Sequence, residues 1–284
     1  MSRKECPACS SKFKVFKYET DGFTINKCTK CHTLFVENIP SLDELLAQYK
    51  KSDYYHLPID SEERITFENR RRAKIINGFK ATGTVLDIGC AKGSFLDEMK
   101  TYDYDTFGIE MSSVNAELCN AKGHNVYLGD LDSFYKINMG KKFDIISCLD
   151  VLEHIHKPRE FLLAIKSLLK DDGLLILSTP NFSGFISKLL GKRDPYIIPP
   201  EHLNFFTKRG LSRLFKLTGF RVIKLNTFGY LTENGLNRTI LKYFPKYLHN
   251  VSFLLKPTIK LSIKALNYFN QGLELEYYLK HDLR

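Results

Sequence analysis

Short apolar stretches and segments of helical spacing alternate along the middle of the chain. Apolar runs predict buried strands at 84–88, 105–109, 125–128, 143–148, 173–178 and 221–225. Between them, apolar residues three and four positions apart predict helices at 93–100, 112–122, 159–169 and 208–217. Alternating residues at 273–279 predict one more strand. This order is typical of an α/β fold with a parallel sheet covered by helices.

The regions that flank this alternating part have different patterns. The first 39 residues combine cysteines and lysines with short alternating apolar stretches, which predict small strands around a metal. Residues 40–80 have helical spacing, with a capping box at Ser41 and Glu44 and a second helix at 61–79. We therefore expect a metal module at 1–39, a helical linker or lid at 40–80, and an α/β domain at 81–284 with a helical insertion at 229–272.

Composition narrows the class of protein. The 284 residues are 43% hydrophobic and 26% charged, which excludes a disordered or collagen-like chain. No apolar run reaches the length needed to span a bilayer, and the polar start at Met1 lacks a signal peptide. We therefore expect a cytoplasmic protein, in which cysteines serve as metal ligands more often than as disulfides.

Charge is unevenly distributed along the chain. The formal net charge of +10 divides into +4 for residues 1–80, −5 for 81–180 and +11 for 181–284. The last third includes a stretch with six basic and no acidic residues, Arg238, Lys242, Lys246, Lys256, Lys260 and Lys264. A cationic helical segment such as 234–272 could bind an anionic membrane surface or an anionic substrate. The alternative is that its lysines form a solvated face of an insertion that shapes the acceptor pocket.

Two Cys-x-x-C pairs lie near the start of the chain. Cys6 and Cys9 form the first pair, and Cys28 and Cys31 form the second, 18 residues later. This spacing predicts a zinc ribbon with four thiolate ligands. Because four thiolates leave no open coordination position, we expect the zinc to be structural.

Acidic residues end three successive predicted strands. Asp87 precedes a turn of small residues at 89–93, where glycines let the backbone approach a ligand. Glu110 ends the next strand, 21 residues after Gly89, at a distance that suits the hydroxyls of a ribose. Asp130 ends the third, and the negative middle third of the chain suits a cationic ligand.

With these motifs, residues 80–228 and the terminal strand resemble the class I S-adenosylmethionine-dependent methyltransferases. The resemblance includes the blocks 143–154 and 173–181, and it departs from the family at Ala91, where a glycine is usual. It implies a Rossmann-like, seven-stranded sheet. It also implies that Asp87 and the turn hold the methionine moiety, Glu110 the ribose, and Asp130 with Leu131 the adenine. The cofactor-binding residues that we derive from it are Asp87, Gly89, Cys90, Ala91, Gly93, Glu110, Met111, Asp130, Leu131 and Leu149.

Two tyrosines of the linker are further candidates for the cofactor site. Tyr54 and Tyr55 resemble the segment that folds over the cofactor in sugar methyltransferases with an N-terminal zinc module. We expect one of them to contact the cofactor as part of a lid, with ordinary packing of an aromatic linker as the alternative.

Methyl transfer to oxygen or carbon usually requires a base, and two histidines qualify. His202 lies in a segment, 199–207, that resembles the Glu-His-Leu-x-x-Phe-Thr/Ser stretch of a subfamily acting on sugars and small molecules. We expect His202 to be the base, with His154 and Glu201 as the other candidate catalytic residues. Asp150, Glu153 and His154 also resemble a divalent-metal cluster of some quinone-biosynthetic O-methyltransferases, with helix capping by Asp150 as the alternative.

These features together predict a methyltransferase that acts on a sugar or glycan unit, nucleotide- or lipid-linked, in surface polysaccharide or natural-product assembly. We expect an anionic acceptor, with oxygen favoured over carbon as the methylated atom, and membrane contact through 234–272 as an alternative. The combination with a zinc ribbon also resembles ribosomal RNA methyltransferases, which leaves RNA as a second acceptor. A regulatory protein that binds the cofactor without catalysis is a third hypothesis. The sequence predicts no oligomeric state.

Overall fold

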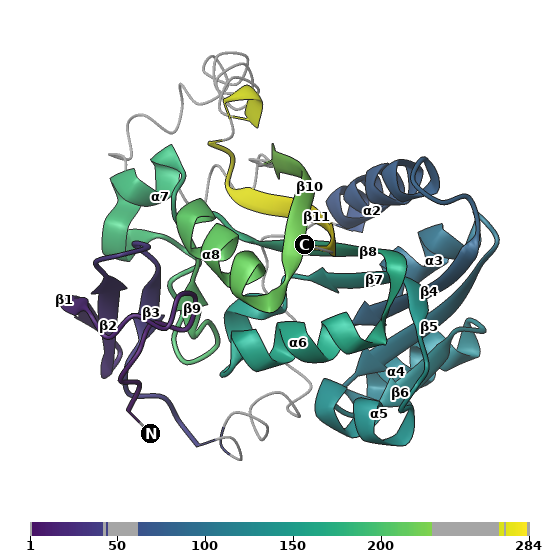
Figure 1. Cartoon of the computed structure of the whole chain (residues 1–284), viewed down its shortest axis with the longest axis horizontal. Helices are drawn as coiled ribbons and strands as arrows, with labels where there is room; N and C mark the ends of the chain where they lie inside the picture. The colour runs from purple at the N-terminus through teal and green to yellow at the C-terminus, as the bar shows by residue number, and fades with distance from the viewer. Residues whose placement is uncertain (1, 42–43, 45–61, 229–266, 270, 283–284) are drawn as a thin grey trace, which may run out of the picture.

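A computed structural model describes residues 2–41, 44, 62–228, 267–269 and 271–282. A large sheet with helices on both faces forms most of the molecule, and a small sheet lies at one end of it (Figure 1). The predicted lid tyrosines, Tyr54 and Tyr55, and most of the basic segment 234–272 lie outside the described residues. Among the residues that the structure describes, no helix combines the length and apolar character needed to cross a bilayer.

The large sheet has seven strands. They are β4 (Gly83–Ile88), β5 (Tyr104–Glu110), β6 (Asn125–Leu128), β7 (Phe143–Leu149), β8 (Leu169–Pro180), β10 (Phe220–Phe228) and β11 (Glu274–His281). Their order is β10-β11-β8-β7-β4-β5-β6, and β11 is antiparallel to both of its neighbours, whereas β4 to β8 are parallel. The predicted seven-stranded, mostly parallel sheet is therefore confirmed.

Helices cover the sheet in two layers because neighbouring strand residues point to opposite faces. Ile145 belongs to the apolar cluster under α2 (Glu62–Asn77) and α3 (Ser94–Lys100). Ile146, the next residue of β7, belongs to the cluster under α6 (Pro158–Leu168) and α8 (Lys208–Thr218). The remaining described helices are α4 (Ser113–Ala121), α5 (Leu131–Ile137), α7 (Phe185–Leu190) and two short 3-10 turns, η2 (Leu152–His154) and η3 (Gly191–Arg193).

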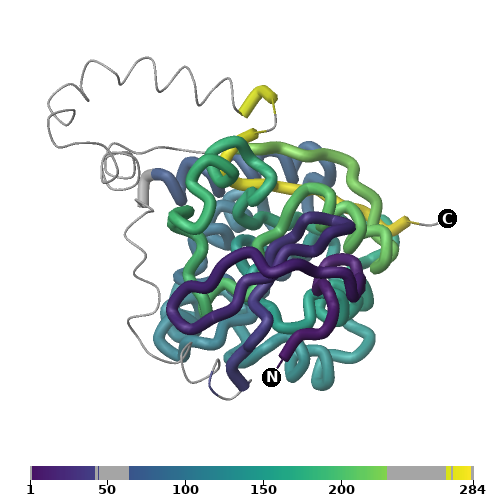
Figure 2. Tube along the Cα trace, turned by 90° about the vertical axis from the view of Figure 1, so that its left-hand side faces the viewer, coloured from purple at the N-terminus to yellow at the C-terminus, as the bar shows by residue number. Residues whose placement is uncertain are grey.

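The small sheet joins the N-terminal module to the large domain. Its strands β1 (Lys14–Thr20), β2 (Phe23–Cys28) and β3 (Leu34–Val36) are followed by β9 (Asn204–Phe205), which comes from the segment after β8. β3 pairs with β9 in antiparallel register. The N-terminal strands consequently lie against the large domain (Figure 2). One apolar cluster contains both the cysteines Cys6, Cys28 and Cys31 and the core residues Leu211 and Leu214 of α8, so the two parts share a core.

The main differences from the sequence prediction are short elements. The helix α5 and the strand β9 were not predicted, because Asp130 was expected to bind a ligand and residues 204–205 have no strand-like pattern of their own. In the structure Asp130 also begins α5 as its N-cap, with its carboxylate accepting a hydrogen bond from the Ser133 N–H at 2.8 Å. The capping box predicted at Ser41 is present, since the Ser41 N–H donates to Glu44 at 2.7 Å.

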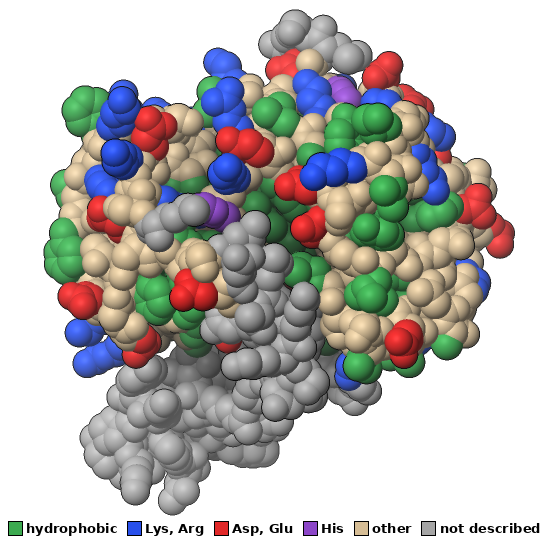
Figure 3. Space-filling view, turned by 90° about the horizontal axis from the view of Figure 1, so that it is seen from below, with side chains coloured by type: hydrophobic (Ala, Val, Ile, Leu, Met, Phe, Trp, Pro, Cys, Tyr) green, Lys and Arg blue, Asp and Glu red, His purple; other side chains and the backbone are tan. Residues whose placement is uncertain are grey.

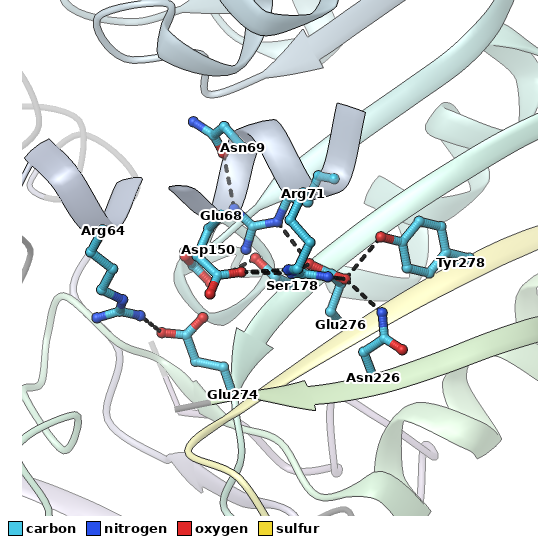
Figure 4. Close-up of polar contacts among 11 residues, drawn as sticks. Arg64, Glu68, Asn69, Arg71, Asp150, Ser178, Asn226, Glu274, Glu276 and Tyr278 are labelled. Atoms are coloured by element: carbon cyan, nitrogen blue, oxygen red, sulfur yellow. Dashed lines mark hydrogen bonds and ion pairs between the residues drawn. The ribbon is translucent and has the colours of Figure 1, made fainter. Parts of the chain in front are cut away.

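A buried ionic network fixes α2 to the last strand (Figure 4). Glu276 of β11 is fully buried and accepts hydrogen bonds from Arg71 at 2.6 Å and from Arg72 at 2.7 Å. Arg64 of α2 makes a parallel ion pair with Glu274 at 2.6 Å. Burial alone raises the pKa of Glu276, but the hydrogen bonds from Arg71 and the charge of Arg72 lower it to about 2. The carboxylate therefore stays ionised and holds both arginines.

Replacement of Glu276 tests how much this network stabilises the fold. Glu276→Gln leaves Arg72 without the carboxylate to which it is hydrogen-bonded, whereas Arg71 keeps its ion pair with the buried Glu68 at 2.7 Å. We expect the free energy of unfolding to fall by about 3–5 kcal/mol. In the wild type, the contribution of Glu276 is present above its unfolded-state pKa of about 4.3 and is lost as the pH falls toward about 2. Urea unfolding at pH 7 measures the effect, and Glu117→Gln, on an exposed position of α4, is the control. Equal stability of the two variants would contradict this prediction.

Candidate active site

Acidic side chains gather at the carboxyl edge of the sheet. Asp87 lies near the end of β4, Glu110 ends β5, and Asp150 directly follows β7. These three strands are neighbours in the order β7-β4-β5 and run parallel, so their carboxyl ends meet at one edge. Because the three acids are far apart in sequence, it is the sheet that concentrates negative charge at one place.

The turn after β4 adopts the left-handed conformations that favour glycine. Gly89 has a φ of +75° and Gly93 a φ of +77°. A Cβ at Gly89 would lie 2.7 Å from a methyl carbon of Val151, so the backbone of this turn closely approaches the segment that follows the neighbouring strand β7. Ala91, the departure from the usual glycine, also has a positive φ, +46°. Its methyl group is thus accommodated at a left-handed position that costs a non-glycine residue about 1–2 kcal/mol.

Glu110 closes this turn onto the end of β5. One of its oxygens accepts the Ala91 N–H at 2.8 Å, and the other accepts the N–H groups of Met111 at 2.9 Å and Ser112 at 2.8 Å. The side chain is only 2% exposed. Backbone N–H groups stabilise the ionised form of a buried carboxylate, so Glu110 supports the turn as well as marking the predicted ribose position.

Asp87 is the buried carboxylate beneath the turn. It accepts a hydrogen bond from the Ser147 hydroxyl at 2.7 Å. Burial raises its pKa to about 7, while the Ser147 hydrogen bond and the charge of Arg72 act in the opposite direction. Near neutral pH this group is therefore poised between its neutral and ionised forms, and a cation placed beside it would favour ionisation.

The other expected cofactor residues lie around the same edge in different environments. Asp130 is exposed and caps α5, and Leu131 behind it is buried. Met111 and Leu149 are half-buried at the ends of β5 and β7, and Cys90 is buried in the turn. The roles expected for these residues remain predictions. The space-filling view from below shows hydrophobic side chains at the bottom of a hollow near the middle of the molecule and acidic side chains on its rim (Figure 3).

The two candidate histidines, one in the turn that follows β7 and the other just before β9, are in contact with each other. His154 ends η2, and its Nδ1 is 2.9 Å from the Glu201 carbonyl oxygen. The Nδ1 of His202 is 2.7 Å from the Tyr196 carbonyl oxygen, and the two rings pack edge to face with centroids 4.7 Å apart. His202 is only 3% exposed, whereas His154 is half-buried. His154 is therefore the more accessible of the two.

Burial shifts both histidines toward the neutral form. Burial, and next the neighbouring His154, lower the pKa of His202 to about 3, and burial also lowers the pKa of His154. A neutral imidazole can accept a proton, but a pKa as low as 3 makes His202 a weak base. Glu201 meets His154 through its carbonyl oxygen, and burial raises the pKa of its half-buried carboxyl group.

Glu153 completes a cluster of metal-ligand type. One ligand atom from each of Glu153, His154 and His202 lies within 4.8 Å of the others. Burial and the charge of Asp150 raise the pKa of Glu153 well above its usual range, and it accepts a hydrogen bond from Thr179 at 2.9 Å. Asp150, the third member of the predicted metal cluster, accepts instead from the Ser178 hydroxyl at 2.9 Å.

The four cysteines of the N-terminal module come together as predicted. The Sγ atoms of Cys6 and Cys31 are 3.5 Å apart, those of Cys9 and Cys28 are 3.6 Å apart, and all four lie within 4.8 Å of one another. A tetrahedron with zinc–sulfur bonds of about 2.3 Å has sulfur–sulfur edges of about 3.8 Å. The donor set and its size therefore fit zinc.

Comparisons with known proteins identify the family. A family model described as "Methyltransferase domain" matches residues 62–225, which is more than half of the chain. The chain belongs to this methyltransferase family. Its methyltransferase domain spans α2 to β10 and contains the acidic edge, the glycine turn and the histidine pair. The prediction of a class I methyltransferase enzyme is thereby confirmed.

Individual relatives of this methyltransferase are more distant. A "Ubiquinone biosynthesis O-methyltransferase" of Glaesserella parasuis is 35% identical over 106 residues, which are 34% of this chain and 45% of that protein. The chain thus spans less than half the length of this curated relative. Among solved structures, a SAM-dependent methyltransferase from Archaeoglobus fulgidus superposes with a TM-score of 0.54 at 22% identity, over 78% of this chain and 94% of that one. A coclaurine N-methyltransferase bound to N-methylheliamine and S-adenosylhomocysteine has a TM-score of 0.51 at 15% identity, with 85% and 81% covered.

These relatives correct the expected acceptor. The sequence led us to expect a sugar or glycan in polysaccharide or natural-product assembly, with RNA as the alternative acceptor. The expectation of a sugar or glycan is wrong, because the curated relatives are named as ubiquinone biosynthesis O-methyltransferases, which act on small molecules. The expectation rested on the 199–207 segment, which resembles a subfamily acting on sugars and small molecules, and on Tyr54 and Tyr55, which resemble a segment of sugar methyltransferases.

Two polar residues of the site were not singled out from the sequence. Ser147 holds Asp87, and Asn204 contacts the turn that carries Glu153 and His154. Each is a polar residue inside an otherwise apolar run, 145–149 for Ser147 and 203–206 for Asn204. That interruption is the signal that could have identified them, since a buried polar side chain requires a partner.

The pKa of Asp87 predicts how cofactor binding depends on pH. If a cationic ligand binds beside this carboxylate, binding requires its ionised form, so the association constant should rise as the pH increases through about 7 and level off above it. Below that range the association constant should fall by about tenfold per pH unit. Asp87→Asn should bind more weakly at pH 8 and lose the pH dependence.

Calorimetric titration with S-adenosylmethionine, which carries the sulfonium charge, between pH 5.5 and 8.5 measures these association constants. Asp105→Asn, at an exposed position near the start of β5, is the control and should titrate as the wild type does. An unchanged pH profile in Asp87→Asn would remove Asp87 from the binding site.

Proposed function

We propose that this protein transfers the methyl group of S-adenosylmethionine to a hydroxyl oxygen of a small molecule. The observation that carries this proposal is that buried carboxylates and a half-buried neutral imidazole lie at one edge of a methyltransferase fold. The curated relatives named as O-methyltransferases support oxygen as the methylated atom. The S-adenosylhomocysteine in a structure of similar fold supports the cofactor.

The acidic edge is suited to a cationic cofactor. S-adenosylmethionine supplies a methyl group activated by a positively charged sulfonium. Asp87 and the 89–93 turn would hold its methionine part, Glu110 its ribose, and Asp130 with Leu131 its adenine. Asp87 gains most from such a ligand, because its ionised form lacks a cation within hydrogen-bond distance among the contacts that the structure describes.

His154 is the base that the geometry favours. It is half-buried rather than enclosed, and the Glu201 carbonyl oxygen fixes the orientation of its ring. A base must reach the hydroxyl proton as the oxygen attacks the methyl carbon. His202, which packs against the His154 ring from a buried position, would act by holding that ring in place.

A phenolic hydroxyl is the acceptor that suits such a base best. Phenols lose their proton with a pKa of about 10, as the side chain of tyrosine does, so a neutral imidazole removes it more easily than the proton of an aliphatic alcohol. We therefore propose a hydroxylated aromatic compound as the acceptor class. The basic segment 234–272 would supply contact with an anionic acceptor or anionic surface, as its charge suggests.

A transfer assay against small hydroxylated aromatics tests this function. With radiolabelled S-adenosylmethionine, we expect the wild type to methylate catechol-type compounds on oxygen, and His154→Ala to lower kcat by about 10²- to 10⁴-fold. His202→Ala should lower kcat less, because it acts through the His154 ring. His32→Asn, at an exposed position of the N-terminal module, serves as the control.

Two results would count against the assignment. If the wild type binds S-adenosylhomocysteine but methylates none of the phenols, the proposed acceptor class is wrong. If His154→Ala keeps the activity of the wild type and His202→Ala loses it, the roles of the two histidines are reversed.

We further propose that the four cysteines bind one structural zinc ion. The spacing of the four sulfur atoms supports this, because all of them lie within 4.8 Å of one another. Elemental analysis of the purified protein should find about one zinc per chain, as a closed four-thiolate site requires.

Cys28→Ser should lose that zinc and unfold at a lower temperature. The control variant Cys148→Ala, at a core cysteine outside the cluster, should keep the metal. Equal zinc content in both variants would contradict the assignment.

A further inference from the structure

The turn that carries Glu153 and His154 is too short to hold its own shape. η2 contains three residues, Leu152–His154, and its internal hydrogen bonds are those of a single turn. The turn follows the end of β7, and the contacts with β8 reach the Asp150 N–H and the Glu153 carboxylate but not the His154 ring. Contacts from elsewhere in the molecule must therefore fix the direction of the His154 side chain.

Asn204 supplies the first set of these contacts. This side chain is fully buried, and its amide nitrogen lies 3.2 Å from the Leu152 carbonyl oxygen, 3.3 Å from that of Glu153 and 2.8 Å from that of Ile155. In addition, the Leu203 N–H donates to the Glu153 carbonyl oxygen at 2.9 Å. One amide group thus faces three carbonyl oxygens of the turn.

Arg3 of the N-terminal module supplies the second set. Its guanidinium donates to the Asn204 side-chain oxygen at 2.7 Å, to the Leu203 carbonyl oxygen at 3.1 Å and to the His156 carbonyl oxygen at 2.6 Å. The residue is only 9% exposed. The hydrogen bond to its side-chain oxygen orients the Asn204 amide so that its nitrogen faces the turn. The planar guanidinium of an arginine has two nitrogen atoms that can make these three hydrogen bonds together, an arrangement that we call the guanidinium fork. The single ammonium nitrogen of a lysine cannot reproduce it.

Backbone pairing between the N-terminal module and the large domain holds Arg3 and Asn204 next to each other. β3 pairs with β9, so Asn204 is part of the small sheet, and the Val36 N–H donates to the Leu203 carbonyl oxygen at 3.0 Å. The Thr207 hydroxyl donates to the Cys31 carbonyl oxygen at 2.8 Å, which links a cysteine of the cluster to the start of α8. The acidic edge that would hold the cofactor contains none of these contacts.

We propose that Arg3 and Asn204 are positioning residues, through which the N-terminal cysteine module sets the orientation of the His154 turn for methyl transfer. This inference rests on the proposed function, because it assigns the turn to the transfer step. It separates two parts of the protein: the acidic edge binds the cofactor, and the cysteine module governs the geometry of the base.

Conservative substitutions in the full-length protein test this proposal. Arg3→Lys keeps the charge and loses the fork, and Asn204→Ser loses the amide that faces the three carbonyl oxygens. For both variants we expect S-adenosylhomocysteine to bind within about twofold of the wild-type affinity, and kcat to fall by about 10- to 100-fold, as for a base displaced by about 1 Å. Lys4→Gln, at the exposed neighbouring position, is the matched control and should behave as the wild type.

Hydrogen exchange gives a readout that does not depend on an acceptor. In Arg3→Lys and Asn204→Ser, exchange of the amides in a peptide spanning 150–157 should increase at least about tenfold, and exchange in a peptide spanning 83–93 should remain unchanged. If the wild type methylates no acceptor, the proposed function fails, and this exchange experiment still decides the positioning role.

Three outcomes would overturn the proposal. The first is wild-type kcat together with wild-type exchange at 150–157 in both variants. The second is loss of S-adenosylhomocysteine binding in both, because the two residues would then support the fold as a whole. The third is an increased exchange at 83–93 equal to that at 150–157, which would show a general loosening of the domain.

Discussion

Burial of several carboxylates at the carboxyl edge of one parallel sheet is the constraint on which the site depends. An ionised carboxylate buried without a counter-charge is unfavourable, and the structure relieves each one differently. Glu110 accepts three backbone N–H groups, Glu276 is paired with two arginines, and the pKa of Glu153 is raised well above its usual range. Among the described residues, Asp87 accepts a hydrogen bond from the Ser147 hydroxyl and feels the charge of Arg72, and its pKa is about 7. A cationic ligand at this edge would remove that remaining penalty, which is the physical reason to propose a sulfonium cofactor here.

The opposite side of the site depends on contacts between distant parts of the chain. The cysteine module reaches the histidine turn through the pairing of β3 with β9 and through the contacts of Arg3. The network of Arg71, Arg72 and Glu276 fixes α2 to β11 on the other face of the sheet. Methyl transfer needs a base held in a narrow range of directions, so rigid support from both sides suits the proposed chemistry.

The features that could be predicted from the sequence have contiguous signals. The strands of the large sheet, the glycine turn, the strand-end acids and the paired cysteines are each encoded within a few residues, and the structure contains all of them. The two-residue strand β9 and the bond between Arg3 and Asn204 could not be predicted, because they join residues about 170 to 200 positions apart. The histidines were placed in the site, but only tertiary packing shows that His202 is enclosed while His154 is more accessible. The sugar acceptor was predicted wrongly because it rested on resemblance of short segments, 199–207 and Tyr54 with Tyr55, and no residue of the sequence names the acceptor.

A crystal structure of the protein with S-adenosylhomocysteine would show whether the acidic edge binds the cofactor and whether His154 faces the transferred methyl group. We expect the ligand at the carboxyl edge of β4 and β5, with its methionine part along the 89–93 turn, its ribose at Glu110, and its sulfur facing the side on which His154 lies. A ligand bound elsewhere, or at this edge with its sulfur directed away from His154, would contradict the account.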